Sequence, residues 1–292
     1  MLFQSKQPHY EHLRRKLSHR HRQSTQNLFD KHLRRVAAGS LGGLMLMTTS
    51  GSVMPDHNLS AENNVQITGS TNNNIGLSLE LKQLVPSEVR PLTREEEAEI
   101  AAKIGEKLGI KVTAEIGDKR LNRSYGLMGG EQHLYRYPGD TVMAQAKTTS
   151  DWAMFGSAGM APGLGAWGYF AQSKDSMTPE QDARERWYIA VQTFLSPGFS
   201  ERVAEYRDFY KYRKMLVVNP KTGQAVVVNI ADAGPSEWTG KSLGGSPEVM
   251  HELGIAGGPR KGAILYFFID DSQKDLPLGP VKVNSQEIAL SN

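Results

Sequence analysis

Residues 215–235 read MLVVNPKTGQAVVVNIADAGP, and this stretch decides the fold. Two runs rich in β-branched residues, MLVVN and QAVVVNI, flank the turn sequence PKTG, a pattern typical of a β-hairpin. The second run ends in Asp232, which is followed by Ala233 and the turn pair Gly234-Pro235. The pattern therefore predicts two antiparallel strands, with a carboxylate at the rim of the sheet.

The sequence after this hairpin predicts a short helix and one more strand. Ser246 followed by Pro247 and Glu248 is a typical helix start, and Gly254 is placed to end the helix. The segment GAILYFFIDD at 262–271 is almost wholly apolar, so we expect a strand covered on both faces. It should share a sheet with residues 224–230.

Before the hairpin, the dominant signals are helical. Thr93 and Glu96 have the spacing of a capping box, as have Thr178 and Gln181. The apolar spacing then predicts helices over 178–194 and 200–210. Between the capping boxes, the segment MAPGLGAWGYF at 160–170 is expected to be a glycine-rich turn leading into a strand, with Trp167 and Tyr169 on one face.

The N-terminal region differs from the rest of the 292-residue chain. Residues 1–35 hold nine basic and two acidic residues, and the uncharged, mostly apolar stretch 36–53 follows. We interpret residues 1–55 as a basic arm with an export signal or membrane anchor whose N-terminus stays in the cytoplasm. The alternative is a basic tail for nucleic acid followed by a buried helix. Residues 56–90 are expected to be a disordered Asn/Ser-rich linker.

Composition excludes several classes of site. The chain has no cysteine, which rules out disulfides, thiolate metal sites and a cysteine nucleophile. No H-E-x-x-H or clustered His/Asp spacing occurs, so we expect no metal and no cofactor. Gly163, Gly165 and Gly168 form a dinucleotide fingerprint by chance, because Pro162 precedes it instead of a strand. Without its arm the chain carries about −4, so we expect no nucleic-acid partner.

Two side chains remain as candidates for chemistry. Asp232, at a sheet rim and backed by apolar residues, could have its pKa raised by desolvation, as a general acid requires. The alternative is that Asp232 only caps its turn by accepting backbone N–H bonds. His133, in GGEQHLYRYPGD, is either a functional imidazole or a structural histidine.

The order of elements from Lys214 to Phe268 resembles the double-psi β-barrel of rare lipoprotein A and its relatives among expansins and lytic transglycosylases. Shared with that family are a valine-rich strand, an N-x-x-x-G turn, a second strand, Asp-x-Gly-Pro and a short helix ending in Leu-Gly. The chain departs from the family at Ala233, where an arginine is common, and at Gly244-Gly245-Ser246, which replaces Asp-Leu-Ser. The His-x-x-x-Pro segment of the family has only a distant echo here, at His133 and Pro138.

The resemblance implies a mainly β fold, α+β overall: a six-stranded double-psi β-barrel with helical insertions, preceded by a disordered N-terminal region. Residues 91–119 would form a satellite helix and strand, residues 120–282 the barrel with a helical insertion at 172–212, and residues 283–292 a tail.

The resemblance also implies a function in the cell envelope. The chain would be secreted or membrane-anchored outside the cytoplasm and would act on peptidoglycan or another envelope glycan, as a lytic transglycosylase. Asp232 would be the catalytic acid and base, His133 a helper, and Trp167, Tyr169 and Trp238 would stack on sugar rings. Two alternatives stay open: an expansin-like module that binds glycan without cutting it, and a surface domain for protein interactions.

Overall fold

The computed structural model describes residues 68–281, and side chains from residue 75. The arm and export segment predicted for 1–55 and the tail predicted for 283–292 lie outside this range. Of the helices described, none is both long and apolar enough to cross a bilayer.

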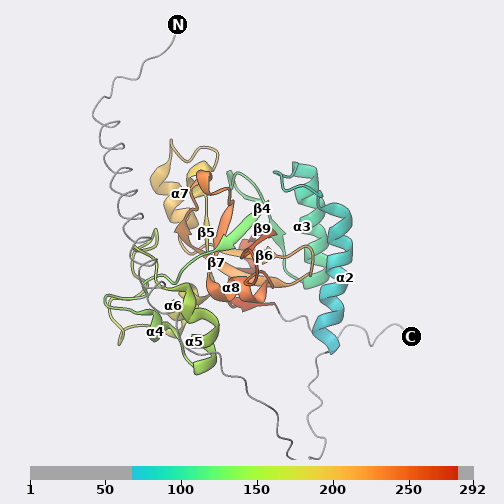
Figure 1. The fold of residues 1–292 in the computed structure, drawn as a ribbon. Coiled ribbons are helices and arrows are strands. Elements are labelled where there is room, and N and C mark those ends of the chain that lie inside the picture. The colour runs from blue at the N-terminus through green and yellow to red at the C-terminus, as the bar shows by residue number, and fades with distance from the viewer. Residues whose placement is uncertain (1–67, 282–292) are drawn as a thin grey trace, which may run out of the picture. The chain divides into compact units, whose positions relative to one another are not determined.

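A closed six-stranded mixed β-barrel forms the centre of the described region (Figure 1). Its strands are β4 (Tyr125–Gly130), β5 (Tyr188–Val191), β6 (Lys214–Val218), β7 (Ala225–Ala233), β8 (Leu243–Gly245) and β9 (Lys261–Ile269). The pairs β4/β8 and β5/β7 are parallel, whereas β4/β9, β5/β8, β6/β7 and β6/β9 are antiparallel. The expected hairpin is β6/β7, and β9 shares its sheet, as predicted.

Three small strand pairings lie outside the closed ring. β1 (Val112–Thr113) extends β9, and β10 (Gly279–Pro280) extends β7. β2 (Glu115–Ile116) and β3 (Lys119–Arg120) form a separate two-stranded ribbon.

The barrel interior is filled by alternate residues of the strands, as period-2 packing requires. On β7 these are Val226, Val228 and Ile230, all fully buried. Helix α8 (Pro247–Glu252), which Ser246 caps by accepting from Val249 N, and helix α7 (Val203–Tyr210) add apolar side chains to the same core. The barrel core is therefore closed by two short helices that follow barrel strands in the chain.

The outer face of β6, β7 and β9 is covered by the helix pair α2 (Thr68–Leu84) and α3 (Arg94–Leu108), as Figure 1 shows. The expected Thr93–Glu96 capping box begins α3. Helix α2 corrects the prediction of a disordered linker over 56–90, because residues 68–84 are helical. Leu77 and Leu81, one turn apart, are fully buried in the second apolar cluster, which outweighs the polar composition around them.

The helix predicted for 178–194 is too long. Helix α6 (Pro179–Arg186) has the expected Thr178–Gln181 capping box but ends at Trp187, and the chain continues as barrel strand β5. All four residues of β5 are buried between β7 and β8. Strand pairing on both sides therefore overrides an apolar spacing that also fits a helix.

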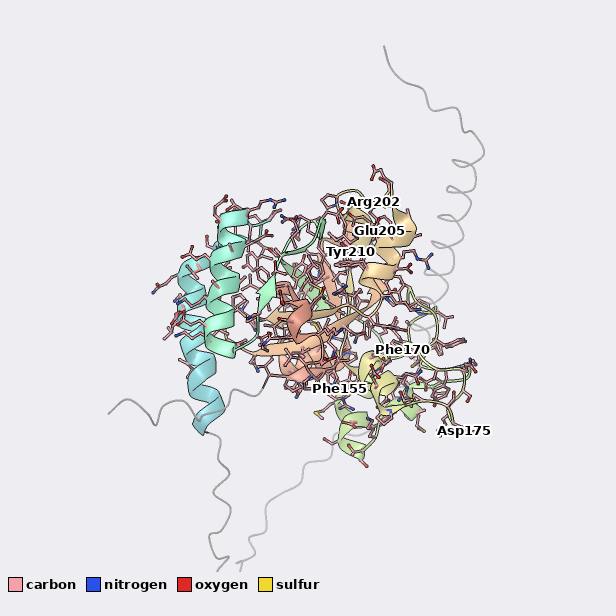
Figure 2. The ribbon with its side chains drawn as sticks, turned by 180° about the vertical axis from the view of Figure 1, so that it is seen from behind. Phe155, Phe170, Asp175, Arg202, Glu205 and Tyr210 are labelled. Carbon is pink, nitrogen blue, oxygen red and sulfur yellow. The ribbon has the colours of Figure 1, made fainter. Side chains whose placement is uncertain are left out.

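Between β4 and α6 the chain makes a long excursion with the short helices α4 (Val142–Gln145), α5 (Thr149–Phe155) and η1 (Gly156–Ala158). Figure 2 labels Phe155 and Phe170 in this part of the molecule. A buried arginine holds the excursion together: Arg136 binds Asp140 and donates to Asp182 Oδ1 over 2.6 Å. The strand expected after residue 160 is absent: Met160 makes an isolated bridge with His133, and residues 161–170 form an irregular loop with a turn at 166–167.

Candidate functional site

Asp232 is the second-to-last residue of strand β7, and it is half-buried at the end of the barrel. Its Oδ1 accepts hydrogen bonds from Ala233 N and from Ala166 N, both over 2.8 Å. Burial raises the pKa of the Asp232 carboxyl, although the two N–H bonds act in the opposite direction. Both readings of Asp232 from the sequence are thus present at once: it caps a turn through Oδ1, and it is a desolvated acid.

A β-bulge sets the position of Asp232. Between β5 and β7 the register shifts, so that Ile189 pairs with Ile230 but the next residue, Ala190, pairs with Asp232. The extra residue, Ala231, packs in a small cluster with Leu134 and Tyr188 outside the main core. Bulges redirect the side chains that follow them, and this one occurs at the edge where the site lies.

Glu131 is a second carboxyl beside Asp232. It follows β4, its backbone N donates to Gly245 O over 2.8 Å, and its side chain lies across Gly244 of β8. Burial raises the pKa of Glu131, Lys241 lowers it, and the negative charge of Asp232 raises it further. Ala190 of β5 pairs with Asp232 on one side and with Gly244, across which Glu131 lies, on the other, so the two carboxyls are at the same end of the barrel.

The side chains of Glu131 and Lys241 lie directly against glycine backbone. A Cβ on Gly244 would come within 2.1 Å of Glu131 Oε1, and a Cβ on Gly129 within 2.4 Å of Lys241 Cε. Lys241 Nζ is 3.8 Å from Glu131 Oε1. The facing glycines of the parallel pair β4/β8 therefore leave room for a carboxylate and an ammonium close to the backbone.

The three predicted aromatic residues lie on two loops. Trp167 is half-buried, donates from Nε1 to Ile230 O over 3.0 Å, and follows the residue that binds Asp232. Tyr169 is on the same loop and exposed. Trp238, in η3 (Glu237–Thr239), is 87% exposed. Trp167 is thus next to the Asp232 contact, whereas the other two rings are open to solvent.

His133 does not share this open site. Its side chain is 2% exposed, Nε2 lies 3.3 Å from Phe155 O, and Nδ1 lies 3.5 Å from Glu185 Oε1. Desolvation lowers the pKa of His133, but the hydrogen bond and charge of Glu185 and the charge of Glu248 outweigh it, so the pKa is raised. Glu248, at the start of α8, has its pKa raised to about 7 by burial and by the charge of Glu185.

The short loop 131–134 connects the open site to this buried cluster. Glu185 Oε1 accepts from Leu134 N over 2.9 Å, and the buried hydroxyl of Tyr188 donates to Gln132 O. The sequence predicted Asp232 and Trp167 but missed Glu131, Lys241, Glu185 and Glu248. Glu131 could have been noticed because it lies between Gly130 and Gln132-His133 in the sequence. No sequence pattern points to Lys241, Glu185 or Glu248, because only the fold brings them close to Asp232 and His133.

Within residues 68–281, no group of three or more His, Asp or Glu side chains is arranged to hold a metal ion. No family model, no curated protein and no solved structure matches the chain.

Proposed function

We propose that this chain is a divergent member of the rare lipoprotein A type of double-psi barrel, exported to the cell envelope, and that it cleaves peptidoglycan glycan strands as a lytic transglycosylase. The observation that carries the proposal is the pair of half-buried carboxyls, Asp232 and Glu131, at one end of the six-stranded barrel. The basic arm and apolar segment of residues 1–53 support export.

In this reaction Asp232 acts first as an acid and then as a base. Its free Oδ2 donates a proton to the glycosidic oxygen while the C1–O bond breaks, leaving positive charge on the sugar ring. The sugar's own 6-hydroxyl attacks C1, and its proton returns to Asp232. The product is a 1,6-anhydro sugar, and no water is consumed. The raised pKa of Asp232 supports the first step, because a general acid must hold its proton near neutral pH.

Glu131 and Lys241 provide charge beside the reacting bond. An ionised Glu131 would stabilise the positive charge that develops at C1, since fixed charges act strongly in a partly desolvated site. The family commonly has an arginine where this chain has Ala233. Lys241, whose Nζ lies 3.8 Å from Glu131 Oε1, would provide the positive charge instead. Trp167 would lie against a sugar ring.

The test is release of 1,6-anhydro products from isolated cell-wall sacculi by the purified full-length protein. Asp232→Asn should lower the rate by about 10²–10⁴-fold, the usual contribution of a general acid. Its stability should change by no more than about 1 kcal/mol, because Asn keeps Oδ1 as an acceptor for Ala166 N and Ala233 N. The control is Asp175→Asn, on the exposed loop tip labelled in Figure 2.

A second candidate is a glycan-binding module without turnover, and the specific observation in its favour is the exposed ring of Trp238. If wild type and Asp232→Asn both bind sacculi and neither releases anhydro products, the binding module replaces the enzyme. A large loss of melting temperature in Asp232→Asn would mean that the carboxylate serves the turn.

A further inference from the structure

A groove with a volume of about 670 Å³ lies between α2, the residues that follow it, and the turn that joins β6 to β7. This volume is in the usual range for small-molecule sites. The groove has an apolar wall, made by Leu79, Leu81, Val85, Pro86 and Pro220. Figure 1 shows α2 on the opposite side of the barrel from α5 and α6.

The charged side chains of this groove are all positive. In the part of the chain that the structure describes, two lysines line it, Lys82 and Lys221, and no acidic residue does. Both lysines are exposed, and neither has a carboxylate of the described region within ion-pair distance. Glu80, the acidic residue of α2, is bound instead by Lys103 and Lys107 of α3, over 3.0 and 2.8 Å. The two lysines at the groove are therefore available to an anion.

Tyr125, the first residue of β4, adds a buried hydroxyl to the groove. The residue is 4% exposed, and within residues 68–281 its Oη forms no hydrogen bond. Burial raises the pKa of Tyr125, so the hydroxyl keeps its proton and can donate it in a hydrogen bond. Buried tyrosine hydroxyls usually have a partner. A ligand in the groove that carries an acceptor oxygen would supply one.

Apolar surface continues from the groove along α2. Ile75 and Leu79, one turn apart on the helix, are 50% and 60% exposed, and Leu79 also lines the groove. An aliphatic chain laid against α2 would cover both side chains. A neutral apolar molecule would leave the two lysines without a counter-charge, and a cation would be repelled by them. The ligand that fits is an aliphatic chain that ends in an anionic oxygen group.

We propose that this groove binds an aliphatic carboxylate of the fatty-acid type. The carboxylate accepts a hydrogen bond from Tyr125 Oη and is neutralised by Lys82 and Lys221, while the chain packs against Leu79 and the apolar wall. The site is separate from Asp232, and the inference does not rest on the proposed function.

The experiment is calorimetric titration of the purified full-length protein with three probes that share one alkyl chain, each below the concentration at which it forms micelles. The probes are decanoate, 1-decanol and decyltrimethylammonium. Decanoate should bind most tightly and decyltrimethylammonium least, because the charges at the groove are positive. Acetate, which has the head group without the chain, should show no binding.

Substitutions in the groove separate the head group from the chain. Tyr125→Phe should weaken decanoate binding by about tenfold, the usual effect of losing a hydrogen bond to a charged group, and should leave the melting temperature unchanged. Lys82→Met and Lys221→Met should each weaken it by about two- to fivefold, as for exposed ion pairs. The matched control is Lys174→Met, beside Asp175, which Figure 2 labels on the side of the molecule away from α2.

Leu79→Gln reports on the chain. It should weaken decanoate and 1-decanol alike, by about threefold, because both probes lose the same apolar contact. Equal binding of the three probes overturns the inference, and so does the absence of decanoate binding. Decanoate binding that Tyr125→Phe and both lysine substitutions leave unchanged also overturns it, since the ligand would then lie elsewhere on the protein.

Discussion

The loop 131–134 lies between two groups of acidic side chains, one accessible to solvent and one buried. On one side, Glu131 and Asp232 are half-buried, have a lysine nearby, and are reached by solvent. On the other, His133, Glu185 and Glu248 are all at most 5% exposed. Consecutive side chains that alternate in direction explain how one short loop serves both. The comparison teaches that a raised pKa identifies a functional carboxyl only together with access, since both clusters contain one.

The largest expected effect is on the buried side. Glu185→Ala removes the acceptor of Leu134 N and leaves His133 without its carboxylate partner. Loss of one member of a buried hydrogen-bonded pair costs about 3–5 kcal/mol. Urea unfolding at pH 6 measures it. Glu185→Gln keeps an oxygen for Leu134 N and should cost clearly less; if Glu185→Ala is as stable as wild type, the cluster does not hold the loop.

The next effect is a pH dependence of stability to which the buried cluster contributes through Glu248 and His133. The folded-state pKa of Glu248 is about 7 against 4.5 for the free group, and the pKa of His133 is also raised, so the folded chain holds more protons than the unfolded one. Stability therefore falls as pH rises from about 4.5 through 7. The groups that act on Glu248 are Glu185, His133 and Arg186.

Glu248→Gln tests this dependence. The variant should match wild type near pH 4.5 and be more stable at pH 8 by on the order of 2–3 kcal/mol, which corresponds to the shift of the pKa. Chemical unfolding at a series of pH values shows it. If the two stability curves run parallel, Glu248 ionises in the folded protein as it does in water.

A smaller effect is expected on the pKa of Glu131 on the solvent-accessible side. Asp232→Asn removes a negative charge near Glu131 and should lower the pKa of Glu131, whereas Lys241→Met removes a positive charge and should raise it. Carboxyl-carbon NMR titration measures both shifts. Glu106, a carboxyl on α3, provides the reference whose titration should not move. An unchanged Glu131 in Asp232→Asn would place the two carboxyls too far apart to act together.

The smallest effect on stability is expected at Trp238. Its ring is 87% exposed, so Trp238→Ala should change the free energy of unfolding by at most about 0.5 kcal/mol. Trp167→Ala should cost more, because Trp167 is half-buried and bound to Ile230 O. Thermal melting compares them. If glycan binding falls in Trp238→Ala while melting stays constant, the ring serves a ligand.

The sequence predicted those parts of the fold that local patterns determine. The hairpin of β6 and β7, the continuous apolar β9 and the three caps at Thr93, Thr178 and Ser246 follow from neighbouring residues alone. Strand β5 could not be predicted in this way, because YIAV becomes a strand through its pairing with β7 and β8. Helix α2 was not predicted because most of its residues are polar. It is stabilised by a few leucines that α3 and the barrel bury, and this burial is not visible in the local sequence.

The residues of the candidate site also differ in whether the local sequence predicts them. Asp232 stands out in the sequence because the strand, the acid and the Gly-Pro turn are contiguous. Glu131 and Lys241 come close only after β4 and β8 pair in parallel, which no local pattern reveals. His133 is conspicuous as one of few histidines in the domain, yet burial, which the sequence does not show, separates it from the open site.

The glycine at position 244 has a consequence for mutational scanning. The Cβ of an alanine at this position would collide with Glu131 Oε1, so even a single added methyl group would displace the Glu131 carboxylate. A scan of single substitutions would then score Gly244 as if it took part in the reaction. The same scan run in a Glu131→Gly background should find Gly244 permissive, and that reversal would separate residues that make room from residues that act.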